Sequence, residues 1–136
     1  PIMKMYTLGH NFMPPGIHAG GLRYHGDSPL VSQLLNEGQI EALAVPQVAT
    51  FDAGVQFARA EGIIPAPESC HAIRAAIDEA LKCKITGEPK TILFSLTGHG
   101  HFDMASYDKF FSGQLEDFDY PAEAIAESLK HLPKVG

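Results

Sequence analysis

Residues 97–101, Thr-Gly-His-Gly-His, carry a hydroxyl, two glycines and two imidazoles within one short stretch. The glycines, Gly98 and Gly100, allow a bound group to approach the backbone closely, and the Thr97 hydroxyl can donate or accept a hydrogen bond. The stretch therefore predicts a polar ligand site, although an ordinary turn also produces such a sequence.

His99 and His101 are candidate metal ligands, which Asp103, His25 or Cys70 would complete. The glycine between the two histidines disfavours the strand geometry that would aim both rings at one metal. The sequence holds no G-x-S-x-G elbow, no G-x-G-x-x-G fingerprint and no P-loop. The residues by themselves indicate a polar site in an α/β domain and no particular reaction.

The apolar run at residues 90–96 leads directly into this stretch. It does not alternate with polar residues, which is typical of a strand covered on both faces in a parallel sheet. Ligands of such sheets lie beyond the carboxyl ends of the strands. Short strands are also expected at residues 3–8 and 41–46, so we predict an α/β fold with mostly parallel strands flanked by helices and joined by right-handed crossovers.

Capping signals predict the helices. Ser28 and Pro29 begin one that ends at Gly38, and Thr50 begins another that ends near Gly62. A third begins at Pro67, a fourth covers residues 102–111, and a fifth lies between Pro121 and Pro133. The residues expected to be buried are Leu30, Val31, Leu34, Leu35, Phe51, Val55, Ala58, Ala72, Ile73, Ala76, Ile77, Ala80, Leu81, Ile125, Leu129 and Leu132.

Glu68 and Ser69 lie one turn before the apolar stripe of the third helix, on the same face. A helix amino terminus stabilises a carboxylate by about 0.3 to 1 kcal/mol, which explains where Glu68 lies along the helix but not which way it faces. A functional carboxylate remains the alternative. Cys70 and Cys83 are separated by about 20 Å on this helix, too far to form a disulfide, so buried reduced thiols are expected.

Composition limits the remaining classes. The chain has 136 residues, 45% of them hydrophobic, and a net charge of −6. These values favour one folded domain and argue against a nucleic-acid surface. No apolar run approaches the roughly 18 residues of a membrane span, and the start does not resemble a signal peptide, so the cytoplasm is expected. We expect an irregular segment at residues 1–29, an α/β core at 30–113, and a linker with a last helix at 114–136.

Three stretches together resemble a known family: residues 18–26 (HAGGLRYHG), 61–72 (EGIIPAPESCHA) and 96–100 (LTGHG). They are similar to the carboxyl-terminal part of the tryptophan synthase β chain of the second, divergent type, and the resemblance spans essentially the whole chain. It implies a pyridoxal-phosphate (PLP) enzyme of fold type II, a lyase of tryptophan biosynthesis. Such enzymes condense L-serine with indole by β-replacement.

The resemblance also implies roles for residues. Thr97 stands where the family has the serine of L-S-G-R-G, which bonds the pyridine nitrogen of the cofactor, and Gly98 follows it in the same loop. His99 replaces the arginine of that motif. Glu68 and Ser69 match the P-A-x-E-S segment beside the cofactor, where the glutamate shapes protonation.

Residues 18–26 resemble the family's substrate wall, with Gly21 and Arg23 near the substrate. Arg23 replaces the usual aspartate, and because arginine pairs well with phosphate, O-phosphoserine is an alternative substrate to serine. Backbone carbonyls of Tyr24 and Gly26 correspond to the family's monovalent-cation site.

The sequence has neither the family's Schiff-base lysine in H-K-x-N nor its G-G-G-S-N phosphate loop. We therefore expect a carboxyl-terminal fragment that is inactive alone and whose missing amino-terminal portion holds PLP. The other expected partners are the amino-acid substrate, indole, a second copy of the parent chain and a tryptophan synthase α chain, with no nucleic acid and no membrane. The alternative is a non-catalytic α/β module that binds a small molecule.

Overall fold

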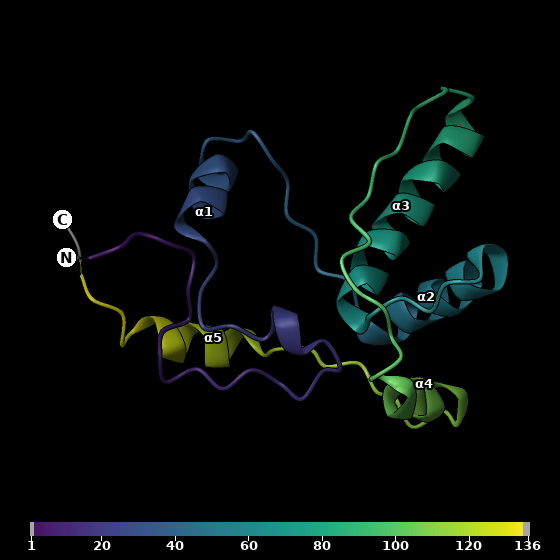
Figure 1. The fold of residues 1–136 in the computed structure, drawn as a ribbon. Helices are drawn as coiled ribbons and strands as arrows, with labels where there is room; N and C mark the ends of the chain where they lie inside the picture. The colour runs from purple at the N-terminus through teal and green to yellow at the C-terminus, as the bar shows by residue number, and fades with distance from the viewer. Residues whose placement is uncertain (1, 135–136) are drawn as a thin grey trace. The chain divides into compact units, whose positions relative to one another are not determined.

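The computed structural model describes residues 2–134 and shows a chain of helices joined by extended segments (Figure 1). In order, the elements are the 3-10 helix η1 (Gly20–Leu22) and the α-helices α1 (Pro29–Asn36), α2 (Gln47–Glu61), α3 (Pro67–Thr86), α4 (Met104–Phe111) and α5 (Ala122–Leu129). No strand is assigned in this part of the chain. Its β-structure consists of isolated antiparallel bridges, Thr7 with Gly26 and Pro65 with His99.

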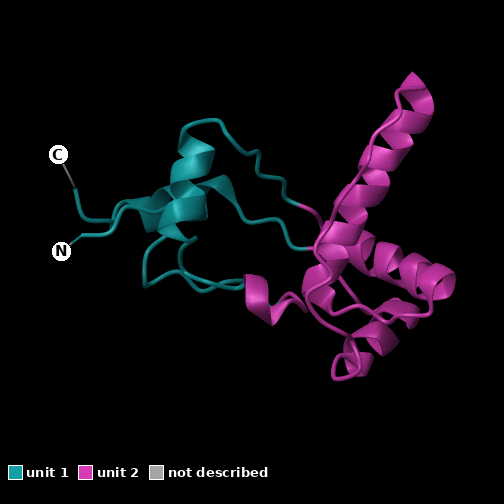
Figure 2. Cartoon of the chain, turned by 45° about the horizontal axis from the view of Figure 1, so that its top comes forward, with its two compact units in different colours: residues 1–16, 23–44, 118–136 teal, residues 17–22, 45–117 magenta. Residues whose placement is uncertain are grey.

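The chain forms two compact units (Figure 2). Unit 1 contains residues 1–16, 23–44 and 118–136, and unit 2 contains residues 17–22 and 45–117. Unit 2 therefore includes η1, α2, α3 and α4, together with most of the residues singled out by the sequence.

The core of unit 2 forms where α2, α3 and α4 meet. Phe51 and Val55 of α2 pack with Cys70 of α3, Tyr107 of α4 and Leu115. The rings of Phe51 and Tyr107 meet edge to face, with centroids 5.0 Å apart. Edge-to-face aromatic pairs add about 0.5 to 1.5 kcal/mol beyond the area they bury, so this contact ties α4 to α2.

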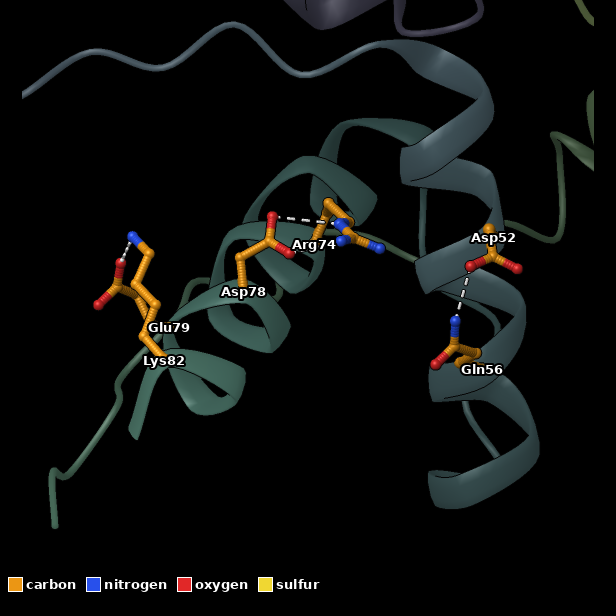
Figure 3. Close-up of polar contacts among 6 residues, drawn as sticks. All are labelled: Asp52, Gln56, Arg74, Asp78, Glu79 and Lys82. Carbon is orange, nitrogen blue, oxygen red and sulfur yellow. Dashed lines mark hydrogen bonds and ion pairs between the residues drawn. The ribbon is translucent and has the colours of Figure 1, made fainter. Parts of the chain in front are cut away.

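The solvent faces of α2 and α3 carry polar pairs at helical spacing (Figure 3). Gln56 donates to Asp52 on α2, and on α3 Arg74 bonds Asp78 while Lys82 bonds Glu79. Exposed pairs of this kind contribute only a few tenths of a kcal/mol each. They mark the outer faces of the helices and do not hold the unit together.

Unit 1 has a smaller set of contacts. The Tyr6 N–H donates to the buried Ser32 hydroxyl of α1 at 3.1 Å. The Phe12 and Tyr120 rings meet edge to face at 5.0 Å. The irregular amino-terminal segment is thus held both to α1 and to the chain just before α5.

The predicted helices are confirmed, and their ends follow from local signals. Pro29 and Pro67 occupy first helical positions, where the missing N–H costs nothing. Gly62 and Gly87 each end a helix at a φ of 72°, a left-handed conformation that glycine adopts without strain. The predicted start of α2 at Thr50 is wrong: the helix begins at Gln47, and Thr50 is buried within it, donating to the Gln47 carbonyl.

Three predicted apolar faces are wrong in whole or in part. On α5 no residue is buried, and Leu129 is 48% exposed. On α1, Leu30 is 79% exposed, and the buried residue is Ser32. On α3 the stripe buries Ile73, but Ala80 and Leu81 near the far end are exposed. The apolar spacing was sufficient for helix formation, but these faces lack a covering element among the described residues.

The strands expected at residues 3–8, 41–46 and 90–96 are absent from the described structure. Residues 90–96 instead run as an extended segment back along α3 (Figures 1 and 2). Ile92 and Phe94 turn toward α2 and α3, where they line an apolar groove of about 420 Å³. Leu93 between them is 95% exposed. A strand needs a neighbour for its backbone groups, and residues 2–134 supply none here, so the parallel sheet is not confirmed.

Within residues 2–134, no helix has both the length and the apolar character to cross a membrane.

Candidate functional site

The site begins where residues 64–66 pair with residues 98–100. The Ala66 N–H donates to the Gly98 carbonyl at 2.9 Å, and the Gly100 N–H donates to the Ile64 carbonyl at 2.8 Å. A Cβ atom at Gly100 would collide with the Pro65 carbonyl oxygen. Glycine is required at that position because the two backbones approach so closely, and the pairing brings Thr97 beside the first turn of α3.

A pair of hydroxyls marks this junction. The Thr97 N–H donates to Ser69 Oγ at 3.1 Å, and Ser69 Oγ lies 3.3 Å from Thr97 Oγ1. Ser69 is buried, whereas Thr97 is exposed. The Ser69 hydroxyl can therefore donate to Thr97 Oγ1, which leaves the Thr97 hydroxyl proton available to an outside acceptor.

Glu68, the residue before Ser69, holds the glycine-rich segment against α3. The Gly21 N–H donates to Glu68 Oε1 at 2.7 Å. A Cβ atom at Gly21 would lie 3.1 Å from Glu68 Cγ, so glycine allows this approach. Glu68 also lies in the first turn of α3, where the helix dipole stabilises negative charge. The bond to Gly21 gives the carboxylate a defined orientation.

His18 anchors the same segment from its other end. Its N–H donates to Gln47 Oε1 at 3.1 Å, and its Nδ1 lies 3.1 Å from Ser106 Oγ. Gln47 in turn donates to the Glu116 carbonyl. The first turn of α2, through Gln47, and the first turn of α4, through Ser106, therefore both hold residues 18–22.

Cys70 and Tyr107 lie buried beneath the loop. The Tyr107 hydroxyl donates to the Pro65 carbonyl at 2.6 Å and lies 3.4 Å from Cys70 Sγ. Burial raises the pKa of both the Cys70 thiol and the Tyr107 phenol, so both keep their protons at neutral pH. Since the tyrosine has one O–H and gives it to Pro65, the thiol is the donor to Tyr107.

Burial also lowers the pKa of His71, more strongly than nearby Glu68 raises it. His71 follows Cys70 on α3 and is half-buried. The neutral imidazole is therefore favoured beside the site.

The structure brings together the predicted site residues that fall in unit 2, namely Gly21, Glu68, Ser69, Thr97 and Gly98. The other three predicted site residues, Arg23, Tyr24 and Gly26, belong to unit 1. Arg23 and Tyr24 are exposed. Gly26 pairs with Thr7, whose hydroxyl donates to the His25 carbonyl.

His99 and His101 lie beside the site but do not form a metal centre. Their rings meet at 4.9 Å, and both side chains are exposed. Among the described residues, no group of three or more His, Cys, Asp or Glu side chains could hold a metal ion. The metal alternative thus lacks the third ligand that Asp103, His25 or Cys70 would have supplied.

Sequence reasoning missed Ser106, Tyr107, Gln47 and the anchoring role of His18. A buried tyrosine needs a partner for its hydroxyl, but the pattern of residues 102–111 does not show which aromatic residue is buried. The contacts of these four residues join segments far apart in the chain, so no local spacing reveals them.

Known proteins match the chain closely. It is 70% identical over 115 residues to the tryptophan synthase beta chain 2 of Methanosarcina acetivorans, covering 85% of this chain and 26% of that protein. The corresponding protein of Aquifex aeolicus is 66% identical over 117 residues, and the tryptophan synthase beta chain of Pyrococcus horikoshii is 54% identical over 119 residues. These cover 86% and 88% of this chain, and 27% and 26% of those proteins. No protein-family model matches. The chain thus spans about a quarter of the length of the curated relatives it matches.

Proposed function

We propose that this chain, homologous over 85% of its length to tryptophan synthase beta chains, forms one wall of the active site of a PLP-dependent lyase. The proposed reaction is β-replacement, in which indole displaces the β-substituent of L-serine or O-phosphoserine to give L-tryptophan. The observation that carries the proposal is the convergence of residues 18–22, 61–72 and 96–100 at Glu68, Ser69 and Thr97.

The side chains at this site fit the ring end of PLP by their chemistry. Thr97 is exposed, and its Oγ1 lies 3.3 Å from Ser69 Oγ, so its hydroxyl proton is available to an outside acceptor when Ser69 is the donor in this pair. A neutral hydroxyl suits a pyridine nitrogen that accepts a hydrogen bond, because it gives that nitrogen no proton of its own. Gly98 keeps the loop close to α3, since a Cβ atom there would lie 3.2 Å from Ala66 Cβ.

When bound, PLP supplies an electron sink for the amino acid. Thr97 would hold the ring nitrogen with a neutral hydroxyl, which would moderate that sink and favour loss of the β-substituent. Glu68, oriented by its bond from Gly21, would lie near the ring and influence protonation there. Ser69 holds the Thr97 backbone through its bond from the Thr97 N–H.

The substrate wall is proposed to contain Gly21 and Arg23. The guanidinium of Arg23 would pair with an anionic leaving group, so O-phosphoserine is proposed as an alternative substrate to L-serine. From the resemblance we also propose a monovalent cation held by the backbone carbonyls of Tyr24 and Gly26. A homodimeric parent and a tryptophan synthase α chain are proposed as partners on the same basis.

This sequence contains neither the lysine of H-K-x-N nor the G-G-G-S-N loop. We therefore propose that the chain is inactive alone and that a longer protein, called here the parent chain, supplies both groups. The matched 115 residues make up 26% of the Methanosarcina acetivorans protein, so that relative is about four times as long as the matched segment.

Titration of the parent chain with PLP tests the proposal. We expect an absorption maximum displaced from that of free PLP. Thr97→Val keeps the side-chain volume and the backbone bond to Ser69 but removes the hydroxyl, so it should change the spectrum of the bound cofactor and lower kcat about tenfold or more. Because Thr97 is exposed, the free energy of unfolding should change by less than about 1 kcal/mol.

Thr91→Val is the matched control, because Thr91 is exposed on the segment that precedes the loop. It should leave spectrum and kcat unchanged. A folded parent chain that gives no displaced absorption would refute the enzyme and favour the non-catalytic binding module. Equal losses of stability and rate in Thr97→Val would refute the role of its hydroxyl.

A further inference from the structure

Helix α4 touches two separate walls of the site through neighbouring residues. Ser106 Oγ lies 3.1 Å from His18 Nδ1, at the base of the Gly21 segment. The Tyr107 hydroxyl donates to the Pro65 carbonyl at 2.6 Å, in the loop that leads to Glu68. The helix itself begins a few residues after Gly100, which ends the third segment. All three site segments are therefore connected to α4.

We propose that α4 sets the geometry of the site, with Ser106 and Tyr107 as positioning residues. The role of these residues toward PLP and substrate rests on the proposed function, whereas the mechanical role does not. Ser106 acts through His18 on the segment whose Gly21 amide orients Glu68. Tyr107 acts through Pro65 on the backbone pairing that carries Thr97.

The Tyr107 bond is suited to this role because it is buried. Tyr107 is 4% exposed, and its ring packs closely against Gly100, where a Cβ atom would lie 3.0 Å from Tyr107 Cε2. Burial raises the pKa of the phenol, so the group remains a donor at neutral pH. Tyr107→Phe would leave the Pro65 carbonyl without that donor while keeping the ring packed on Phe51.

The Ser106 contact is separable from the Tyr107 contact although the residues are adjacent. Ser106 is half-buried and reaches His18, and His18 is held independently by Gln47 through its backbone N–H. Ser106→Ala therefore removes the side-chain bond and leaves the backbone anchor intact. Its effect should reach Gly21 and Glu68 but not Thr97.

We expect Tyr107→Phe and Ser106→Ala to cause different binding defects. Tyr107→Phe should loosen the loop under Thr97, shift the absorption spectrum of bound PLP and weaken PLP binding about tenfold. Ser106→Ala should leave that spectrum unchanged and weaken amino-acid binding about tenfold, measured as the dissociation constant from the spectral change on adding L-serine. If Ser106 and Tyr107 had only structural roles, both substitutions would lower thermal stability. They would not separate a defect in PLP binding from a defect in amino-acid binding.

Hydrogen exchange supplies a readout that needs neither PLP nor turnover. In Ser106→Ala the Gly21 amide should exchange faster, and in Tyr107→Phe the Ala66 and Gly100 amides should exchange faster. Ser112→Ala and Tyr120→Phe are matched controls, since the Ser112 hydroxyl bonds only carbonyls of its own helix and Tyr120 lies in unit 1. Ser106→Thr, which keeps the hydroxyl, should restore the behaviour of the original protein.

The experiment is performed on the parent chain, and its outcomes are distinct. Faster exchange at the named amides, with cofactor and substrate defects divided as above, supports the inference. If the unsubstituted parent gives no displaced PLP spectrum, the proposed function fails, and the exchange data alone then decide the mechanical role of α4. The inference would be overturned if exchange at these amides were unchanged in both variants. It would also be overturned if the two variants showed identical exchange and binding defects.

Discussion

Helix α2 approaches α3 closely at Gly54, and Gly54→Ala tests the packing there. A Cβ atom at Gly54 would lie closer than 3.0 Å to Cys70 Sγ and 3.1 Å from the Tyr107 oxygen. Neither neighbour can retreat easily: Cys70 is 0% exposed, and Tyr107 is held by its bond to Pro65. The added methyl group therefore has no space to occupy.

The magnitude follows from two opposing effects. Overpacking a close-packed core costs about 1 to 3 kcal/mol, and the upper value applies where two rigid neighbours are crowded at once. Alanine gains about 1 kcal/mol over glycine inside a helix. We therefore expect Gly54→Ala to lower the free energy of unfolding by about 2 kcal/mol, despite the higher helix propensity of alanine.

Urea unfolding of the parent chain, followed by circular dichroism, measures this change. Gly16→Ala is the control, because no atom lies within 4 Å of a Cβ at Gly16, and it should change stability by less than about 0.5 kcal/mol. Removing the sulfur in the double variant Gly54→Ala, Cys70→Ala should recover at least about 1 kcal/mol relative to the sum of the single effects. If Gly54→Ala matches Gly16→Ala, or if the double variant is simply additive, this account of the helix contact is wrong.

Two further predictions concern charge. Because burial lowers the pKa of His71 below its ordinary 6.5, the unfolded state binds a proton that the folded state resists, so stability should fall as the pH drops below 6.5. His71→Gln should flatten this dependence in unfolding measured from pH 7 to pH 5, and an unaltered slope would exclude His71 as its source. Arg23→Asp should shift the ratio of kcat/KM for O-phosphoserine over L-serine toward serine by about tenfold or more. Arg59→Asp, on the exposed face of α2, is the control and should leave this ratio of kcat/KM values unchanged. If the ratio is the same in both variants, Arg23 does not interact with the leaving group.

Helix ends were predictable because their signals are local. Pro67 can occupy a first helical position without losing a hydrogen bond, and Gly87 adopts the left-handed conformation that ends the same helix. Thr50 misled the prediction of the second helix, because a hydroxyl suits both a cap and a buried helix position where it bonds the carbonyl three residues back. The side chain alone does not distinguish these two environments.

The predicted sheet failed for a non-local reason. Residues 90–96 have a strand-like composition, but a strand exists only when another backbone pairs with it, and residues 2–134 provide no such partner. The candidate site was predictable only in part. Glu68 was singled out by its facing, and Thr97 by the loop it begins, but the contact of Glu68 with Gly21 spans 47 positions of sequence and follows only from the fold.

The exposed Leu93 has a consequence for the behaviour of the chain in solution. Residues 90–96 are extended and apolar, and their only charge is Lys90 at the start. An extended apolar segment with an uncovered edge is a template onto which another chain can add as a strand, and lysine is one of the residues that discourage such addition. Aggregation of the isolated chain should therefore increase with its concentration. A polypeptide segment that covers this edge would block such strand addition and so protect the chain from aggregation.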